Sequence, residues 1–438
     1  MPQNALRAIL LTCLFIALTS IDINAQEINY RRSSLHLILI ESDNFPNKES
    51  VMSSYNSYPF PDRYNEHNIG IKSFNPANYK ITDAEREANG SAKSKLGKLT
   101  SKAVSESSNG MIDSVARDLP LQIEKFIKDN QIAKKVAAKW FNRKDDGTID
   151  YELIKQRGAY SASAEDKDMA NATASASDYL LDFELIGNSF VVFNKQTFVS
   201  NEIAARIIRD IALSKADSIP NEQLKQKAIE GANKIYERTK EGYTVITKSW
   251  LYQLNWNEEV ATTFKSYFLN EKIDSKAAWD TTTLFKLNFI GDEVSSALVT
   301  FSLKTKRTEN EIIDLAVKRN IDNVFSKLQK KYEVFRPVSP VTTVGPVTAR
   351  IGKKEGLEPG QTFDVLESRK DPKTGAYKYE SIGTVKVSKK APIWDNRIGS
   401  KEEPELDESG NPIVTPEFTT FDGGKKVQPG MHFLRLKK

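Results

Sequence analysis

Residue types that commonly perform catalysis are few and scattered along this chain. The three histidines, His36, His67 and His432, lie far apart, and none belongs to a His-x-x-His pair or a His-Glu-x-x-His motif. The single cysteine is Cys13, close to the N-terminus. The sequence contains no Walker loop, dinucleotide-binding fingerprint or Gly-x-Ser-x-Gly elbow. We therefore predict no catalytic residue, no metal site and no bound cofactor.

Carboxylates are a separate case, because glycoside hydrolysis needs only two of them. The segment 145–150, Asp-Asp-Gly-Thr-Ile-Asp, is similar to the start of a calcium loop, but such a loop needs an oxygen ligand at its third position, where this chain has Gly147. We interpret the segment as a turn. Asp182 and Glu184 are predicted to share one face of a strand, without an identifiable opposing acid. A carboxylate-dependent hydrolase of envelope or dietary glycans is the alternative function.

Aromatic residues offer two candidate binding surfaces. Trp250, Tyr252 and Trp256 point to one face of a predicted strand, where they form either core packing, the interpretation we favour, or a platform for sugar stacking. The second surface is an aromatic residue with polar neighbours in a long polar segment: Trp394, Asp395, Asn396 and Arg397. These four residues are predicted to contact a partner protein or to close one end of a barrel.

The first twenty-five residues have the composition of a secretory signal peptide. Arg7 supplies a positive charge, Ala8–Leu18 is almost wholly apolar, and Asn24-Ala25 is a small-residue break before Gln26. The residue before Cys13 is a threonine, whereas lipid attachment favours a smaller one. No later apolar run approaches the ~20 residues that cross a bilayer. We expect cleavage after Ala25 and an exported protein, without a transmembrane segment, in the periplasm or cell envelope.

Composition narrows the choice of partner. The chain has 63 basic and 58 acidic residues, a net charge of +5, and its charges are interspersed. No extended basic face stands out, so nucleic acid is not expected as a partner. Cleavage of the leader would remove the only cysteine, which excludes disulfides and thiolate chemistry from the mature chain. An envelope protein or a cell-wall component is the expected partner, and the oligomeric state is left open.

Apolar periodicity predicts a mixture of helices and strands as far as residue 336. Strands are expected at 35–40, 243–256, 284–290 and 294–303, and helices at 119–141, near 203–211 and at 224–235. Apolar bursts on either side of Gly187-Asn188 predict a hairpin over 180–199. The clearest helix covers 309–332, with Thr308 as its N-cap and Glu311 as the acid of a capping box.

The last hundred residues are predicted to be β throughout. Strands are expected at 347–351, 362–367, 377–387 and 432–436, with a long polar excursion over 389–426. Gly356 and Gly360 supply turn conformations, while Phe363, Val365 and Val387 are expected to fill a barrel interior. This pattern resembles small envelope β-barrel modules such as the C-terminal domain of flagellar assembly protein T. The resemblance implies an SH3-like barrel that binds other molecules.

These elements define the predicted organisation of the chain. The fold class is α+β, in which a mixed helix and sheet region precedes a small C-terminal barrel. Two prolines, Pro337 and Pro340, mark the boundary before the barrel. The expected parts are the signal peptide at 1–25, a partly irregular region at 26–118, an α+β domain at 119–336 and the barrel at 337–438.

The chain also resembles a set of exported Bacteroidota proteins of unknown function. The resemblance is carried by three segments: 137–143, 185–191 and 393–397. It implies export, and with it the Asp-(Ser/Thr)-apolar pattern that Bacteroidota O-glycosylate on exported proteins. The residues of this chain that match the pattern are Ser114, Ser218 and Thr281. Together these observations predict a non-catalytic binding or assembly component of the cell envelope.

Overall fold

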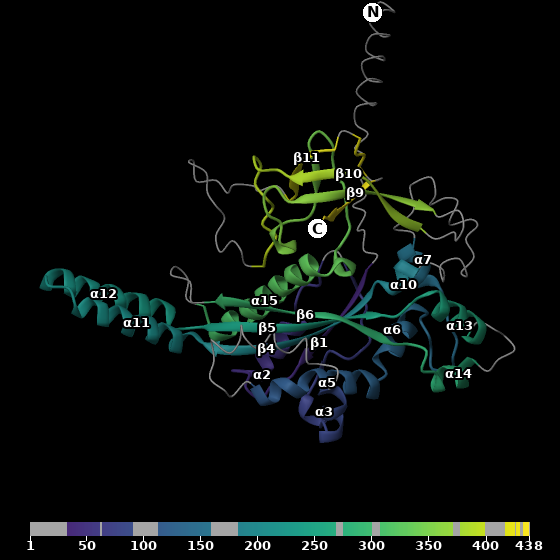
Figure 1. Cartoon of the computed structure of the whole chain (residues 1–438), viewed down its shortest axis with the longest axis horizontal. Coiled ribbons are helices and arrows are strands. Elements are labelled where there is room, and N and C mark those ends of the chain that lie inside the picture. The colour runs from purple at the N-terminus through teal and green to yellow at the C-terminus, as the bar shows by residue number, and fades with distance from the viewer. Residues whose placement is uncertain are drawn as a thin grey trace, which may run out of the picture.

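The computed structural model describes residues 33–61, 64–90, 113–158, 183–268, 275–299, 307–370, 377–398, 417–424, 426–429 and 432–437. A mixed sheet lies between two layers of helices, and a small antiparallel barrel lies beyond one of these layers, next to helix α15 (Figure 1). This arrangement confirms the predicted fold class. The predicted signal peptide lies outside the described residues.

The first sheet is built around one short buried strand. Every residue of β1 (Ser34–Ile40) is buried, as the apolar run in the sequence predicted. The other strands are β2 (Asn65–Glu66), β3 (Ser73–Phe74), β4 (Ser189–Ser200), β5 (Tyr243–Leu254) and β6 (Leu287–Val299). Strands β2, β3 and β4 run parallel to β1, β5 pairs antiparallel with β4, and β6 pairs antiparallel with β5. A strand with helices on both faces is buried on both, which explains the continuous apolar run of β1.

Two expected interruptions in this sheet are wrong: the hairpin at Gly187-Asn188 and the gap between the strands expected at 284–290 and 294–303. The hairpin over 180–199 is instead a short helix, α10 (Phe183–Gly187), followed by the single strand β4. A Cβ on Gly187 would lie 3.5 Å from the backbone oxygen of Trp256. Gly291 lies inside the continuous strand β6, at a register shift, where a Cβ would overlap the Tyr332 ring. Gly291 therefore allows the close approach of Tyr332 rather than a turn, whereas a Cβ at Gly187 would make only an ordinary contact.

One face of the sheet carries the larger helical layer. Its helices are α5 (Asp113–Asp129), α6 (Ile132–Trp140), α7 (Glu152–Gly158), α13 (Glu258–Phe268) and α14 (Ser275–Thr281). The expected single helix over 119–141 begins earlier, at Asp113, and is divided at Gln131, whose φ is 52°. Trp250, Tyr252 and Trp256 are buried in this core, which confirms core packing as the role of the aromatic stripe.

The opposite face is covered by α2 (Lys48–Asn56) and α15 (Glu309–Lys331). The predicted capping box of α15 is confirmed, since the Thr308 side chain accepts from the Glu311 backbone and the Glu311 side chain accepts from Thr308. Smaller elements flank the layers: η1 (Pro76–Asn78), α3 (Asp83–Gly90) and η3 (Glu333–Phe335). Arg336 then binds the carbonyl oxygens of Gln329 and Lys330, which ends α15 where the sequence predicted.

The C-terminal strands form a nearly closed barrel. They are β7 (Ser339–Pro340), β8 (Val347–Ala349), β9 (Thr362–Lys370), β10 (Tyr377–Val387), β11 (Thr419–Gly423) and β12 (His432–Leu436), paired in the order β7-β12-β9-β10-β11-β8. The Thr342 N–H donates to Thr348 O at 2.8 Å and so joins the two ends of the sheet. Phe363, Val365 and Val387 fill the interior as expected. Strand β11 lies within the long polar excursion over 389–426, where no strand was expected.

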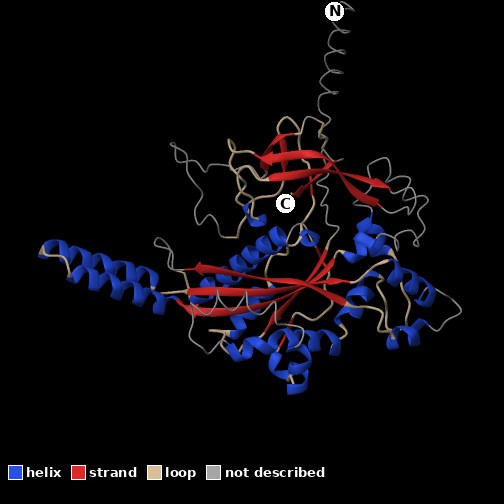
Figure 2. Ribbon diagram, in the orientation of Figure 1, coloured by secondary structure: helices blue, strands red, loops and turns tan. Residues whose placement is uncertain are grey.

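The helices α11 (Asn201–Asp217) and α12 (Glu222–Thr239) form an antiparallel pair that extends away from the sheet (Figure 2). We call this pair the arm. Both helices were expected from the sequence, but they are longer than predicted. The arm leaves the ends of β4 and β5, and in Figure 1 it projects well beyond the helical layers.

Candidate interaction surface

Two of the three histidines, His36 and His67, lie close together in the first sheet, and all three have structural roles. His36 Nε2 is 2.6 Å from Ile71 O, and His67 Nε2 is 2.8 Å from Val136 O. His432 is in the barrel, far along the chain from both. Burial lowers the pKa of His36 to about 4 and that of His67 to about 3. Both rings are therefore neutral near pH 7 and act as buried hydrogen-bond donors.

The carboxylates singled out by the sequence do not form a reaction centre in the described residues. Segment 145–150 is a turn, as predicted, in which Asp146 accepts from the Thr148 N–H at 2.8 Å. Glu184 belongs to helix α10, which corrects its predicted place on a strand, and Asp182 lies outside the described residues. Within the described part of the chain, no group of three His, Cys, Asp or Glu residues could hold a metal ion.

A polar groove of about 860 Å³ lies between the start of α2 and the start of α15. Glu49, Glu311 and Asp314 line it and are the acids that a hydrolase would need there. Glu311 caps α15, however, and Asp314 is 2.8 Å from Lys318. Two of the three carboxylates are thus already held by partners in the same helix. A hydrolase site would lie in this groove, but Glu311 and Asp314 already have structural partners there.

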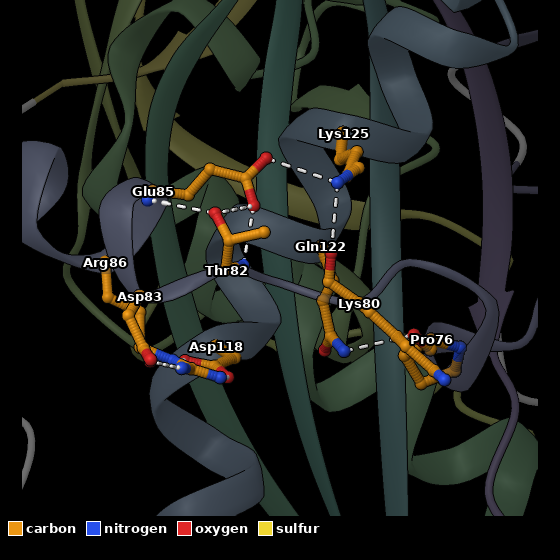
Figure 3. A network of polar contacts seen from close by, with 9 residues as sticks. All are labelled: Pro76, Lys80, Thr82, Asp83, Glu85, Arg86, Asp118, Gln122 and Lys125. Carbon is orange, nitrogen blue, oxygen red and sulfur yellow. Dashed lines mark hydrogen bonds and ion pairs between the residues drawn. The ribbon is translucent and has the colours of Figure 1, made fainter.

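A second group of acids and bases joins α3 to α5 (Figure 3). Glu85 accepts from the Thr82 N–H at 2.7 Å and from Lys125 at 3.2 Å, and these contacts lower its pKa to about 2. Arg86 binds Asp118 at 2.8 Å. Because the acids in this network are paired with bases or with a helix cap, the network explains how α3 is held on α5 rather than how a substrate would react.

The predicted contact segment around Trp394 lies between the barrel and α15. We call residues 394–398 the strap. The Trp394 carbonyl accepts from the Lys353 N–H at 2.9 Å, and the Arg350 guanidinium lies 5.8 Å from the centre of its ring. The ring is half-buried, and the neighbouring Ile393 packs against the barrel core. Trp394 is thus half-buried next to the barrel, and both interpretations of its role stay predictions.

The next strap residues make further contacts within the chain. Asp395 is 2.7 Å from Arg397 and 3.1 Å from Lys353, and the Arg397 guanidinium holds the pKa of this carboxyl well below its usual range. Asn396 accepts from the Lys354 N–H at 2.8 Å. Arg397 is exposed. That the strap contacts a partner stays a prediction, and its internal bonds show that it also fixes the barrel in place.

A buried carboxylate completes this junction. Asp322 of α15 is 3% exposed, and it accepts from the Tyr58 hydroxyl at 2.6 Å. Lys354 of the barrel lies 3.6 Å away, and the Ile398 N–H lies 3.5 Å away. Burial raises the pKa of Asp322. One side chain thus joins α15 to three segments that are distant in sequence, which is a structural role.

The arm is anchored firmly at its base. The Asn201 N–H donates to Gly242 O at 3.1 Å, and its side-chain amide donates to Val299 O at 3.1 Å. Its side-chain oxygen accepts from Thr244 at 2.9 Å. Three backbone or side-chain groups of the sheet therefore hold the first residue of α11. The arm projects from a fixed base, so its outer surface is presented in a defined direction.

Small residues bring the two arm helices together. Ala205 and Ala216 of α11 and Ala232 of α12 are at most 4% exposed. Near the base, the Arg209 guanidinium lies 4.4 Å from the centre of the Tyr236 ring. These contacts use one narrow side of each helix. Most of the larger aliphatic side chains of the arm are not part of this contact.

Those aliphatic side chains face solvent. Six of them are between 53% and 58% exposed: Ile203, Ile207, Ile208, Ile211, Leu224 and Ile235. We call them the outer face. The isoleucine stripe predicted the helix correctly, but its exposure was not expected, because a stripe of this spacing normally marks a side turned toward a core. Contiguous exposed apolar patches on otherwise polar surfaces mark interaction sites.

Of the predicted glycosylation sites, Ser218 follows the end of α11 and Thr281 is the last residue of α14, and both are exposed. Ser114 falls in the first turn of α5, and its side chain lies outside the described residues. Their modification stays a prediction.

Comparison with known proteins adds no further assignment. No protein-family model matches the chain, and no curated protein is significantly similar to it. Among the described residues, no helix is both long and apolar enough to cross a membrane. The resemblances to flagellar assembly protein T and to exported Bacteroidota proteins stay predictions. The outer face of the arm is the feature on which a function can be argued.

Proposed function

We propose that this protein is a non-catalytic binding or assembly component of the cell envelope, exported by its N-terminal signal peptide, and that the arm is its contact surface. The observation that carries the proposal is the outer face, whose six aliphatic side chains are each more than half exposed on a pair of helices that projects from the body. The chain's mixed charges and signal-like leader support a protein partner in the envelope over nucleic acid.

Burial of the outer face by a partner would be energetically favourable. Full burial of an isoleucine or leucine side chain stabilises a structure by about 1.5–3 kcal/mol relative to exposure. Six side chains left more than half exposed therefore forgo several kcal/mol that a partner could recover. The helices place these side chains on a rigid support, so little additional order is lost when a partner binds.

The test is a photocrosslinking experiment in native envelopes. A photoreactive amino acid replaces Ile207 on the outer face or, as the matched control, Glu230, an exposed polar residue of α12. We expect a discrete crosslinked product from position 207 and none from position 230. Equal yields from both positions, or none from either, would contradict the arm as the contact surface.

The hydrolase alternative has its own readout. The purified protein is incubated with envelope glycans, and the release of reducing ends is measured. Release that is abolished by Glu49→Gln in the groove between α2 and α15 would replace the binding proposal with an enzymatic one.

A further inference from the structure

We propose that the outer face of the arm binds the same face of a second copy of this chain, so that two arms form an intermolecular four-helix bundle. This inference rests on the proposed function, because it names the partner of the same surface. It is argued from the spacing of the arm residues, the area that they expose and the charge of the two helices.

Each arm helix carries a heptad-like seam toward the other. On α11 the seam is Ala205, Arg209, Ala212 and Ala216, and on α12 it is Lys225, Ile229, Ala232 and Tyr236. Both follow steps of four, three and four residues, the spacing at which helices pack side by side. All eight residues are buried or half-buried. This seam accounts for the pairing of α11 with α12.

A second seam runs beside the first, displaced by one residue. On α12 it is Leu224, Ala228, Gly231 and Ile235, again with steps of four, three and four. On α11 it contains Ile208, Ile211 and Lys215, with steps of three and four. All of its isoleucine and leucine side chains are more than half exposed.

Two adjacent seams on one helix indicate that it packs against two neighbouring helices. A helix in a two-helix pair needs one seam, whereas a helix in a four-helix bundle contacts two neighbours and needs two. Both arm helices have two. The small residues Ala228 and Gly231 in the second seam of α12 leave room for the close approach of another helix. The missing neighbours are therefore helices, and an arm of a second copy supplies two of them in the required antiparallel arrangement.

The exposed area is that of a weak, reversible pair. An aliphatic side chain buries roughly 100 Å² of apolar surface, so the four side chains of the second seam, Ile208, Ile211, Leu224 and Ile235, present roughly 220 Å² per copy. Two copies would bury about 440 Å² of apolar surface, which implies about 740 Å² in total, because interfaces are only about 60% apolar. This is below the ~1,000 Å² of a stable interface, so we expect a dimer that depends on concentration.

Charge favours a second copy over a lipid surface. Helix α11 has three basic and three acidic residues, and α12 has four basic and three acidic residues. Helices that lie on membranes carry an excess of basic residues and aromatic anchors on the apolar side. The arm has neither a marked basic excess nor aromatic anchors on its apolar side. Its net charge is close to zero, so two copies would not repel each other strongly.

The test is sedimentation of the purified chain that begins at Gln26, over concentrations from about 1 to 100 μM. We expect a dimer whose dissociation constant rises at least 100-fold in Ile211→Glu and in Ile235→Glu, while the matched control Glu230→Lys leaves it within threefold. Because positions 211 and 235 are exposed, the variants should melt within 2–3 °C of the unaltered chain at a concentration where both are monomeric. Ile211→Ser provides a milder variant should the glutamate alter folding.

The outcomes separate this inference from the proposed function. A chain that stays monomeric up to about 100 μM, or a dimer unaffected by the three outer-face variants, overturns the four-helix bundle. Crosslinking from position 207 to a different polypeptide in native envelopes, with a monomeric purified chain, would leave the binding function standing and refute only the second copy. A dimer that dissociates in the variants, with crosslinks between identical chains, supports both.

Discussion

Lowering the pH from 7.5 to 5 should destabilise this protein through two buried histidines. In His67, Nε2 faces the Val136 carbonyl, which can only accept, so Nε2 carries the proton. Its Nδ1 lies 3.2 Å from the Arg157 guanidinium, where a second proton would meet a positive charge. His36 is likewise 1% exposed and faces a carbonyl through Nε2. Folding therefore requires both rings to be neutral.

The magnitude follows from the pKa values. Burial lowers the pKa of His67 from 6.5 to about 3 and that of His36 from 6.5 to about 4. At pH 5, therefore, both histidines bind a proton in the unfolded chain but stay neutral in the folded chain. Stability is then fully present above pH 6.5 and is lost as the pH falls toward the folded values. At pH 5 each histidine removes about 2 kcal/mol, and together they remove about 4 kcal/mol, a large part of a typical folding free energy.

The assay is urea unfolding at pH 7.5 and pH 5 for the unaltered chain and for the double variant His36→Gln, His67→Gln. Glutamine keeps an amide donor but does not titrate. The drop in the free energy of unfolding should be about 4 kcal/mol smaller in the variant. Asp322, whose pKa is raised by burial, acts in the opposite direction but is present in both proteins, so it cancels in the difference. An equal drop in both proteins would refute the reasoning.

Four further predictions follow from individual contacts. Thr308→Ala should lower the free energy of unfolding by about 1 kcal/mol in urea titrations, because it removes the N-cap of α15. Gly356→Ala should destabilise by at least 2 kcal/mol and more than Gly360→Ala: both have positive φ, but only the new Cβ at position 356 would overlap α15. Trp394→Ala should cost about 2 kcal/mol, since the ring is half-buried and its carbonyl contact is retained; a cost of 4 kcal/mol would indicate a barrel plug. N-terminal sequencing of the exported protein should begin at Gln26, and a start at Cys13 would indicate lipidation.

Elements with one strong local signal could be predicted well from the sequence. The capping box and the stripe of α15 fix its start and its buried side, and both agree with the structure. The apolar run at 35–40 and the alternating aromatics near Trp250 likewise gave the correct strands. In each case the signal lies within one element, so it can be recognised without knowledge of the rest of the fold.

Elements whose residues serve a distant segment could not be predicted in this way. Gly291 has a turn-forming neighbour, but the residue that requires a glycine there, Tyr332, lies 41 residues away in sequence. The strap is similar, because its bonds to Lys353, Lys354 and Asp322 become visible only when the barrel is placed on α15. Sequence spacing contains no information about these approaches.

The arm lies between these cases, because its signal was present but open to a simpler interpretation. A stripe of isoleucines at steps of three and four is usually the buried side of a helix, and the sequence alone gave no reason to place it outside. What distinguishes the arm is that each helix contains two such seams, displaced by one residue. A helix that rests on a sheet or on one neighbour needs only one of them. When a short antiparallel pair uses its first seam internally and leaves the second exposed, the second seam specifies a helical partner, and the antiparallel arm of another copy is the partner that this chain itself provides.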